Sequence, residues 1–71
     1  MSNAHYIDNN FKYHAPTPEQ VKVYEGLRDA GKQLAAHIMD VVPDSREQSL
    51  ALTNLEQAIM WANAGIARNA V

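Results

Sequence analysis

The sequence Pro43-Asp44-Ser45-Arg46-Glu47 separates two long stretches that contain no proline. Proline cannot continue a helix, because it lacks an N–H group and its ring clashes with the preceding turn. Asp44 and Ser45 are both good N-caps, and each is followed three positions later by Glu or Gln, as in a capping box. One helix is therefore predicted to end near Val42 and another to begin near Arg46. The short connection is typical of antiparallel helices.

Apolar residues in both stretches recur at spacings of three and four, which places them on one face of a helix. In the upstream helix, expected over residues 18–42, this seam contains Tyr24, Leu27, Gly31, Leu34, Ile38 and Val41. In the downstream helix, expected over residues 46–69, it contains Leu52, Leu55, Ile59, Ala62 and Ile66. The two seams predict an all-α fold, an antiparallel helical hairpin with a short N-terminal segment.

The start of the upstream helix is also marked. Thr17 and Gln20 fit a capping box, and Pro18 occupies the first helical position, where its missing N–H costs nothing. Gly26 and Gly31 lie inside this helix, where each costs about 1 kcal/mol relative to alanine. Glycines at such positions indicate that another backbone or a ligand lies close to them.

The chain has 71 residues and no cysteine, so it forms at most one small domain without disulfides. We expect this domain over residues 11–71, and we expect residues 1–10 to be flexible or ordered only by a neighbouring subunit. Both helices carry apolar residues off their seams: Val23, Ala30, Ala35, Ala36, Met39, Val42, Leu50, Ala51, Ala58, Met60, Trp61, Ala64 and Ala67. A helix that is apolar nearly all round is buried nearly all round, so a compact homo-oligomer is predicted.

Charge and composition exclude several classes. The net charge is −2 and the pI about 5.8, which disfavours a general DNA- or RNA-binding protein. No apolar run reaches the length that spans a membrane, and the first residues do not resemble a signal peptide, so a cytoplasmic location is expected. The histidines have no metal-ligand spacing, and no nucleophile motif or phosphate-binding glycine loop is present. We expect no metal, no cofactor and no enzymatic activity.

An aromatic and basic segment precedes the upstream helix. Phe11, Lys12 and Tyr13 lie on a stretch that the following prolines make extended. One interpretation is that Phe11 plugs the hydrophobic end of the bundle. Tyr13 has a polar tip and a flat face that can stack on a nucleobase. All three residues are candidate ligand contacts.

Basic residues on the helices form the second group of candidates. Arg28 and Lys32 are four residues apart and share a helix face. They are either part of a solvated face with a Glu25–Arg28 pair, or a paired cationic grip for a phosphate diester. Arg68 lies near the end of the downstream helix, where a cation suits the helix dipole.

Blocks throughout the chain resemble a known family. They are Phe11-Lys12-Tyr13-His14-Ala15-Pro16, Leu27-Arg28-Asp29-Ala30 with Leu34-Ala35, Pro43-Asp44-Ser45-Arg46-Glu47, Leu50-Ala51-Leu52-Thr53-Asn54-Leu55-Glu56 and Met60-Trp61-Ala62-Asn63-Ala64-Gly65-Ile66-Ala67-Arg68-Asn69. From Phe11 onward the sequence resembles the phage anti-CBASS protein of the second type. The same hairpin is shared with one group of Thoeris anti-defence proteins.

The resemblance implies a sponge that acts in the cytoplasm of an infected bacterium. Such proteins form compact homo-oligomers, typically hexamers, and bind the cyclic oligonucleotide signals of CBASS synthases without cleaving them. Cyclic dinucleotides such as 3′,3′-cyclic GMP-AMP bind between protomers, near the N-terminal segment and the first helix. Cyclic trinucleotides occupy a separate site where several protomers meet.

The resemblance also implies roles for individual residues. Tyr13 matches a tyrosine that stacks on a ligand base, and Arg28 falls at a basic position that contacts ligand phosphate, where a relative has lysine. Arg68 is the candidate for the trinucleotide site. Gly26 and Gly31 fall where many relatives have larger residues, a departure that affects the shape of the pocket.

Three alternatives remain. A sponge for a cyclised ADP-ribose signal would follow the Thoeris relatives, which carry additional structure before the hairpin, whereas this chain is short before Phe11. A structural or regulatory helical oligomer that binds a protein partner would use Tyr13 and Arg28 only for packing and solubility. A phosphodiesterase would return the signal shortened or linear.

Overall fold

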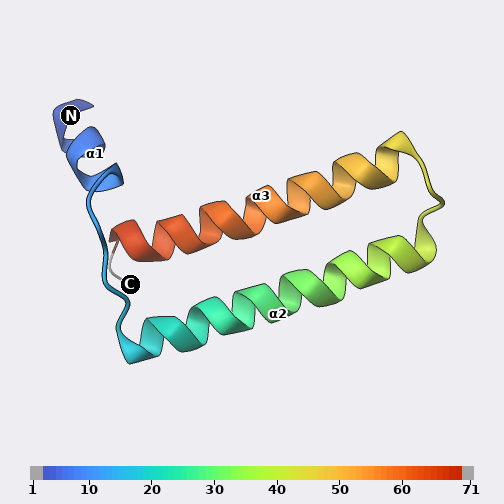
Figure 1. The fold of residues 1–71 in the computed structure, drawn as a ribbon, viewed down its shortest axis with the longest axis horizontal. Coiled ribbons are helices and arrows are strands. Elements are labelled where there is room, and N and C mark those ends of the chain that lie inside the picture. Colours follow the sequence, from blue (N-terminus) through green and yellow to red (C-terminus); the bar gives the residue numbers. More distant parts are fainter. Residues whose placement is uncertain (1–2, 70–71) are drawn as a thin grey trace.

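The computed structural model describes residues 3–69 and contains three helices over that range (Figure 1): α1, Asn3–Asn10; α2, Pro18–Val41; and α3, Arg46–Asn69. Helices α2 and α3 lie side by side and antiparallel, and α1 lies beside the C-terminal end of α3. No strand occurs among the described residues. The prediction of an all-α helical hairpin is therefore confirmed.

The capping box at the start of α2 is formed as predicted. The Gln20 backbone N–H donates to Thr17 Oγ1 at 3.2 Å, and the Thr17 N–H donates to Gln20 Oε1 at 3.0 Å. Pro18 is the first helical residue. Two of the backbone donors that a helix start leaves free are thus satisfied by this one pair of side chains.

The connection between α2 and α3 is fixed by Ser45 and Gln48. Helix α2 ends at Val41, one residue earlier than predicted, and Val42 is its extended C-cap. Ser45 Oγ accepts from the Gln48 backbone N–H at 3.0 Å and so caps α3. The Gln48 side chain is buried, and its Nε2 donates to the Val42 carbonyl at 2.9 Å. Gln48 therefore joins the end of one helix to the start of the next.

Replacing Gln48 by alanine is expected to lower the free energy of unfolding by about 1–3 kcal/mol, because the Val42 carbonyl loses its partner in a half-buried turn. Urea denaturation at a fixed protomer concentration measures this loss. The control is Gln33→Ala, since Gln33 Nε2 donates to Asp29 Oδ2 at 3.2 Å on an exposed helix face. The control should change stability by no more than about 0.5 kcal/mol, and equal losses for the two variants would contradict the prediction.

The seam of α3 is confirmed and that of α2 is partly wrong. All five predicted seam residues of α3 are half-buried. In α2, the predicted Tyr24, Leu27 and Ile38 are half-buried, but Leu34 and Val41 are 47% and 59% exposed. Their neighbours Ala35 and Val42, the C-cap, are half-buried in their place. The prediction assumed a heptad spacing, whereas a straight helix has 3.6 residues per turn and drifts by about 20° per heptad. Over the 24 residues of α2 that drift amounts to about 70°, so seam positions far along the helix, such as Leu34 and Val41, turn away from α3.

Gly31 is the close contact between the helices. It is the one buried residue of α2 in the described chain, and a Cβ atom added there would lie 2.9 Å from Ile59 Cγ1 and 3.1 Å from Ile59 Cδ1. A Cβ at Gly26 would meet nothing within 4 Å. The sequence predicted another backbone or a ligand close to each glycine. At Gly31 the close neighbour is instead the Ile59 side chain, and at Gly26 the described residues provide no neighbour within 4 Å.

Alanine at these two glycines should have different effects. Gly26→Ala is expected to stabilise the chain by about 1 kcal/mol through helix propensity. Gly31→Ala gains the same term but forces Ile59 from its place, at a cost of about 1–3 kcal/mol. The variants should therefore differ by that cost in urea denaturation. A Gly31→Ala protein as stable as Gly26→Ala would show that the Ile59 side chain moves aside at no cost in stability.

The hairpin has no buried apolar side chain among its described residues. The chain measures 44 × 29 × 16 Å, and its described helices form a single layer that no second layer from residues 3–69 covers. Its accessible surface is 5796 Å², against about 4400 Å² for a compact monomer of this mass. This excess of accessible surface is larger than the roughly 800 Å² that each partner buries in a standard protein–protein interface.

Helix α1 was not predicted. Residues 1–10 were expected to be flexible or ordered only by a neighbouring subunit. Residues 1 and 2 lie outside the described range, and Asn3–Asn10 is helical. A helix this short is marginal in isolation and depends on tertiary contacts. One such contact joins α1 to α3: Asn9 Nδ2 donates to the Arg68 carbonyl at 3.2 Å.

Candidate functional site

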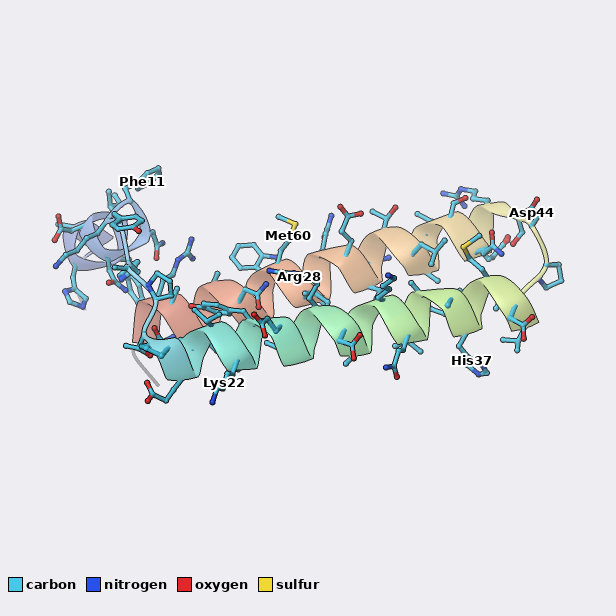
Figure 2. All side chains as sticks on the ribbon, turned by 60° about the horizontal axis from the view of Figure 1, so that its bottom comes forward. Phe11, Lys22, Arg28, His37, Asp44 and Met60 are labelled. Atoms are coloured by element: carbon cyan, nitrogen blue, oxygen red, sulfur yellow. The ribbon has the colours of Figure 1, made fainter. Side chains whose placement is uncertain are left out.

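A groove of about 390 Å³ runs between α2 and α3. Its floor is apolar and half-buried or buried, and consists of Gly31, Ala35, Leu52, Leu55 and Ile59. Arg28 and Lys32 form its rim on α2, and Glu56 and Met60 form its rim on α3. Figure 2 shows Arg28 and Met60 close together, whereas Lys22 and His37 point away on the other side of the hairpin. Because Gly31 has no side chain, it leaves space in the groove.

Two cationic side chains at this groove have no partner among the described residues. Arg28 and Lys32 are exposed, and within residues 3–69 neither forms an ion pair or a side-chain hydrogen bond. The Glu25–Arg28 pair considered from the sequence is therefore not formed. Exposed cations above an apolar floor suit a ligand that combines phosphate oxygens with a flat apolar surface. Arginine can hold two phosphate oxygens at once, and lysine contributes a point charge.

The aromatic segment lies elsewhere in the chain. Phe11, Lys12 and Tyr13 connect α1 to α2 and cross the open end of the hairpin (Figure 1). Phe11 is 87% exposed and Tyr13 is 83% exposed, and none of the three residues lines the groove. Phe11 therefore does not plug the hairpin of its own chain. Both aromatic rings are available to a ligand or to another molecule.

Arg68 occupies a third place. It is half-buried in the last turn of α3, where its charge suits the helix dipole, and its carbonyl accepts from Asn9. At the groove, one chain thus brings together Arg28 and Lys32. It keeps the aromatic segment and Arg68 apart from their groove.

Glu56 and Met60 were not predicted as site residues. They lie one turn apart on α3, facing Arg28 and Lys32 across the groove. Pairing the helices antiparallel about the loop places Gly31 against Ile59, and that register would have brought these residues to the rim. The sequence carried this signal, but it required the two helices to be considered as a pair.

The described chain also bears on metals and membranes. Among residues 3–69, no group of three or more histidine, cysteine, aspartate or glutamate side chains is placed to hold a metal ion. None of the described helices has an apolar stretch long enough to cross a lipid bilayer.

Comparison with known families decides the classification. The family model described as the Acb2/Tad1 hairpin domain matches residues 3–67. The chain belongs to this family. The match spans α1, α2 and nearly all of α3, which confirms the resemblance to anti-CBASS and Thoeris anti-defence sponges. Membership of the Acb2/Tad1 hairpin family supports a sponge-type anti-defence role. The chain has no significant match among curated proteins or among solved structures.

Proposed function

We propose that the protein is a non-catalytic sponge that binds cyclic oligonucleotide second messengers in the cytoplasm of an infected bacterium. By withholding the signal from its effector, it blocks the host immune response. Membership of the Acb2/Tad1 hairpin family over residues 3–67 is the observation that carries this proposal. The groove with Arg28 and Lys32 on its rim gives the proposal a physical basis.

The chemistry of a cyclic dinucleotide fits the residues that the chain exposes. Such a ligand carries two negative phosphates and two flat bases, and its binding needs cations and stacking surfaces but no metal. Arg28 and Lys32 supply positive charge beside the groove, and Tyr13 supplies an exposed ring. Phe11 and Lys12 adjoin Tyr13 and can add a second ring and a further charge.

A homo-oligomer, which we take to be a hexamer, brings these parts together. Two copies related by a two-fold axis present Arg28 and Tyr13 twice, in a pattern that matches a ligand with approximate two-fold symmetry. The uncovered surface of the hairpin favours such assembly. So does Asn63 Oδ1, which is buried without a hydrogen-bond partner among the described residues and can accept from another copy.

A calorimetric titration with 3′,3′-cyclic GMP-AMP tests the proposal. The bound ligand is then released by denaturation and identified by mass spectrometry, and native mass spectrometry counts the subunits. Tight binding with intact ligand recovered is the expected result. A linear or shortened product would instead indicate a phosphodiesterase.

Two further ligands extend the titration. A cyclic trinucleotide tests a second site, for which Arg68 is the proposed phosphate contact. Cyclised ADP-ribose tests the alternative sponge, the activity of the Thoeris relatives. Failure of all three ligands would reject the sponge and favour a helical oligomer with a protein partner.

A further inference from the structure

Asn9 holds three parts of the chain together. Its side-chain Nδ2 donates to the Arg68 carbonyl at the end of α3, at 3.2 Å. Its own carbonyl lies 2.9 Å from His14 Nε2 and accepts from the Lys12 backbone N–H at 3.4 Å. A carbonyl oxygen only accepts, so His14 Nε2 must carry the hydrogen. Residues 9–14 are therefore closed into a loop that is fastened to α3.

This loop carries the exposed aromatic rings. Phe11 and Tyr13 lie between the two residues that close it, and more than four-fifths of each side chain is exposed. Packing of the rings cannot define the shape of the loop, because the rings contact so little of the chain. The loop is instead held by the hydrogen bonds of Asn9 and His14 and by the Phe11 backbone N–H, which donates to the Ile7 carbonyl at 3.1 Å.

We propose that Asn9 and His14 are positioning residues that present Tyr13 to a base of the ligand. The inference rests on the proposed function. A loop that is already ordered loses less conformational freedom when a base stacks on Tyr13, and preorganisation of this kind raises affinity without a new contact. Because the Arg68 carbonyl anchors the loop, the end of α3 determines the position of Tyr13.

A double-mutant cycle tests the inference. Calorimetry with 3′,3′-cyclic GMP-AMP compares the intact protein, Asn9→Ala, Tyr13→Ala and the double variant. Asn9→Ala is expected to weaken binding about tenfold, the size of one lost hydrogen bond. In the Tyr13→Ala background it should weaken binding less than about twofold, because residues that act through one another are not additive.

Matched variants separate positioning from stability. Asn54→Ala removes a bond of Asn54 Nδ2 to the Leu50 carbonyl, 2.8 Å long and within one helix, and should leave affinity unchanged. His14→Gln keeps an N–H donor and should lose less affinity than His14→Ala. Trypsin cleavage after Lys12, followed by mass spectrometry without ligand, should accelerate in Asn9→Ala and not in Asn54→Ala.

Several outcomes overturn the inference. They are unchanged affinity in Asn9→Ala, equal losses in both backgrounds, unchanged cleavage after Lys12, and dissociation of the oligomer by Asn9→Ala. If the intact protein binds 3′,3′-cyclic GMP-AMP, and Tyr13→Ala weakens this binding while Asn9→Ala does not, the positioning role alone is rejected. If the intact protein binds no cyclic nucleotide at all, the proposed function fails, and the inference is rejected with it.

Discussion

Arg28→Glu is expected to weaken binding of 3′,3′-cyclic GMP-AMP by at least about 100-fold. Losing a charge-assisted hydrogen bond costs about 1.5–3 kcal/mol, and a carboxylate in place of the guanidinium adds repulsion from the phosphates. The neighbouring Lys32 cannot compensate, because a point charge does not reproduce the bidentate geometry of arginine. Calorimetry measures the affinity, and light scattering compares the oligomeric state of the variant with that of the intact protein.

The matched control is Lys22→Glu. Lys22 is exposed on α2 and points away from the groove (Figure 2), and its replacement changes the net charge by the same amount as Arg28→Glu. A general electrostatic effect would weaken binding in both variants. A local phosphate contact weakens it in Arg28→Glu alone. Similar losses in both would count against the groove as the phosphate site.

Salt dependence gives a second measurement on the same residue. Neutralising phosphates releases counterions, so affinity falls as salt rises. Arg28→Ala should therefore bind more weakly and show a flatter dependence on salt than the intact protein. Arg28→Lys should keep most of the salt dependence and lose affinity through geometry. A slope unchanged in Arg28→Ala would exclude Arg28 as a phosphate ligand.

The hairpin itself could be predicted because its determinants are local. Thr17 with Gln20, and Ser45 with Gln48, mark the helix starts through side-chain contacts within four residues. A proline at each boundary excludes a continuous helix. These signals need no knowledge of tertiary structure, and the observed helix starts at Pro18 and Arg46 agree with them.

The errors arise where distant parts of the chain decide the outcome. The exact seam of α2 depends on helix twist accumulated along its length, so Leu34 and Val41 were placed wrongly and Ala35 and Val42 were missed. Helix α1 has no periodic pattern of its own and is fastened through a hydrogen bond to Arg68, 59 residues away. The residue pattern within one segment cannot predict a contact with a residue so distant in the sequence.

The candidate site shows the same division. Arg28 and Lys32 were found because a spacing of four on one helix is a local property. Glu56 and Met60 were missed because they reach the groove only through the pairing of α2 with α3. Tyr13 and the groove lie apart within one chain, so a joint role depends on the contacts between copies.

Tyr13→Ala is expected to weaken binding of 3′,3′-cyclic GMP-AMP by about 1–3 kcal/mol, the contribution of one base stacked on an aromatic ring. The ring is 83% exposed, so its removal leaves no cavity and should not change the free energy of unfolding. Affinity and stability should therefore separate in this variant, with calorimetry showing a loss and urea denaturation showing none. A parallel loss of both would assign Tyr13 to packing between copies.

Tyr13→Phe and Phe11→Ala complete the comparison. Phenylalanine retains the stacking face and loses only the hydroxyl, so Tyr13→Phe should bind nearly as well as the intact protein. Phe11 is equally exposed on the same loop, and its truncation tests whether any aromatic ring there contributes. If Phe11→Ala costs as much as Tyr13→Ala, both rings stack, as expected for a ligand with two bases. If only Tyr13→Ala costs affinity, the two bases are held by the same residue of two copies, and the two-fold axis of the assembly passes through the ligand.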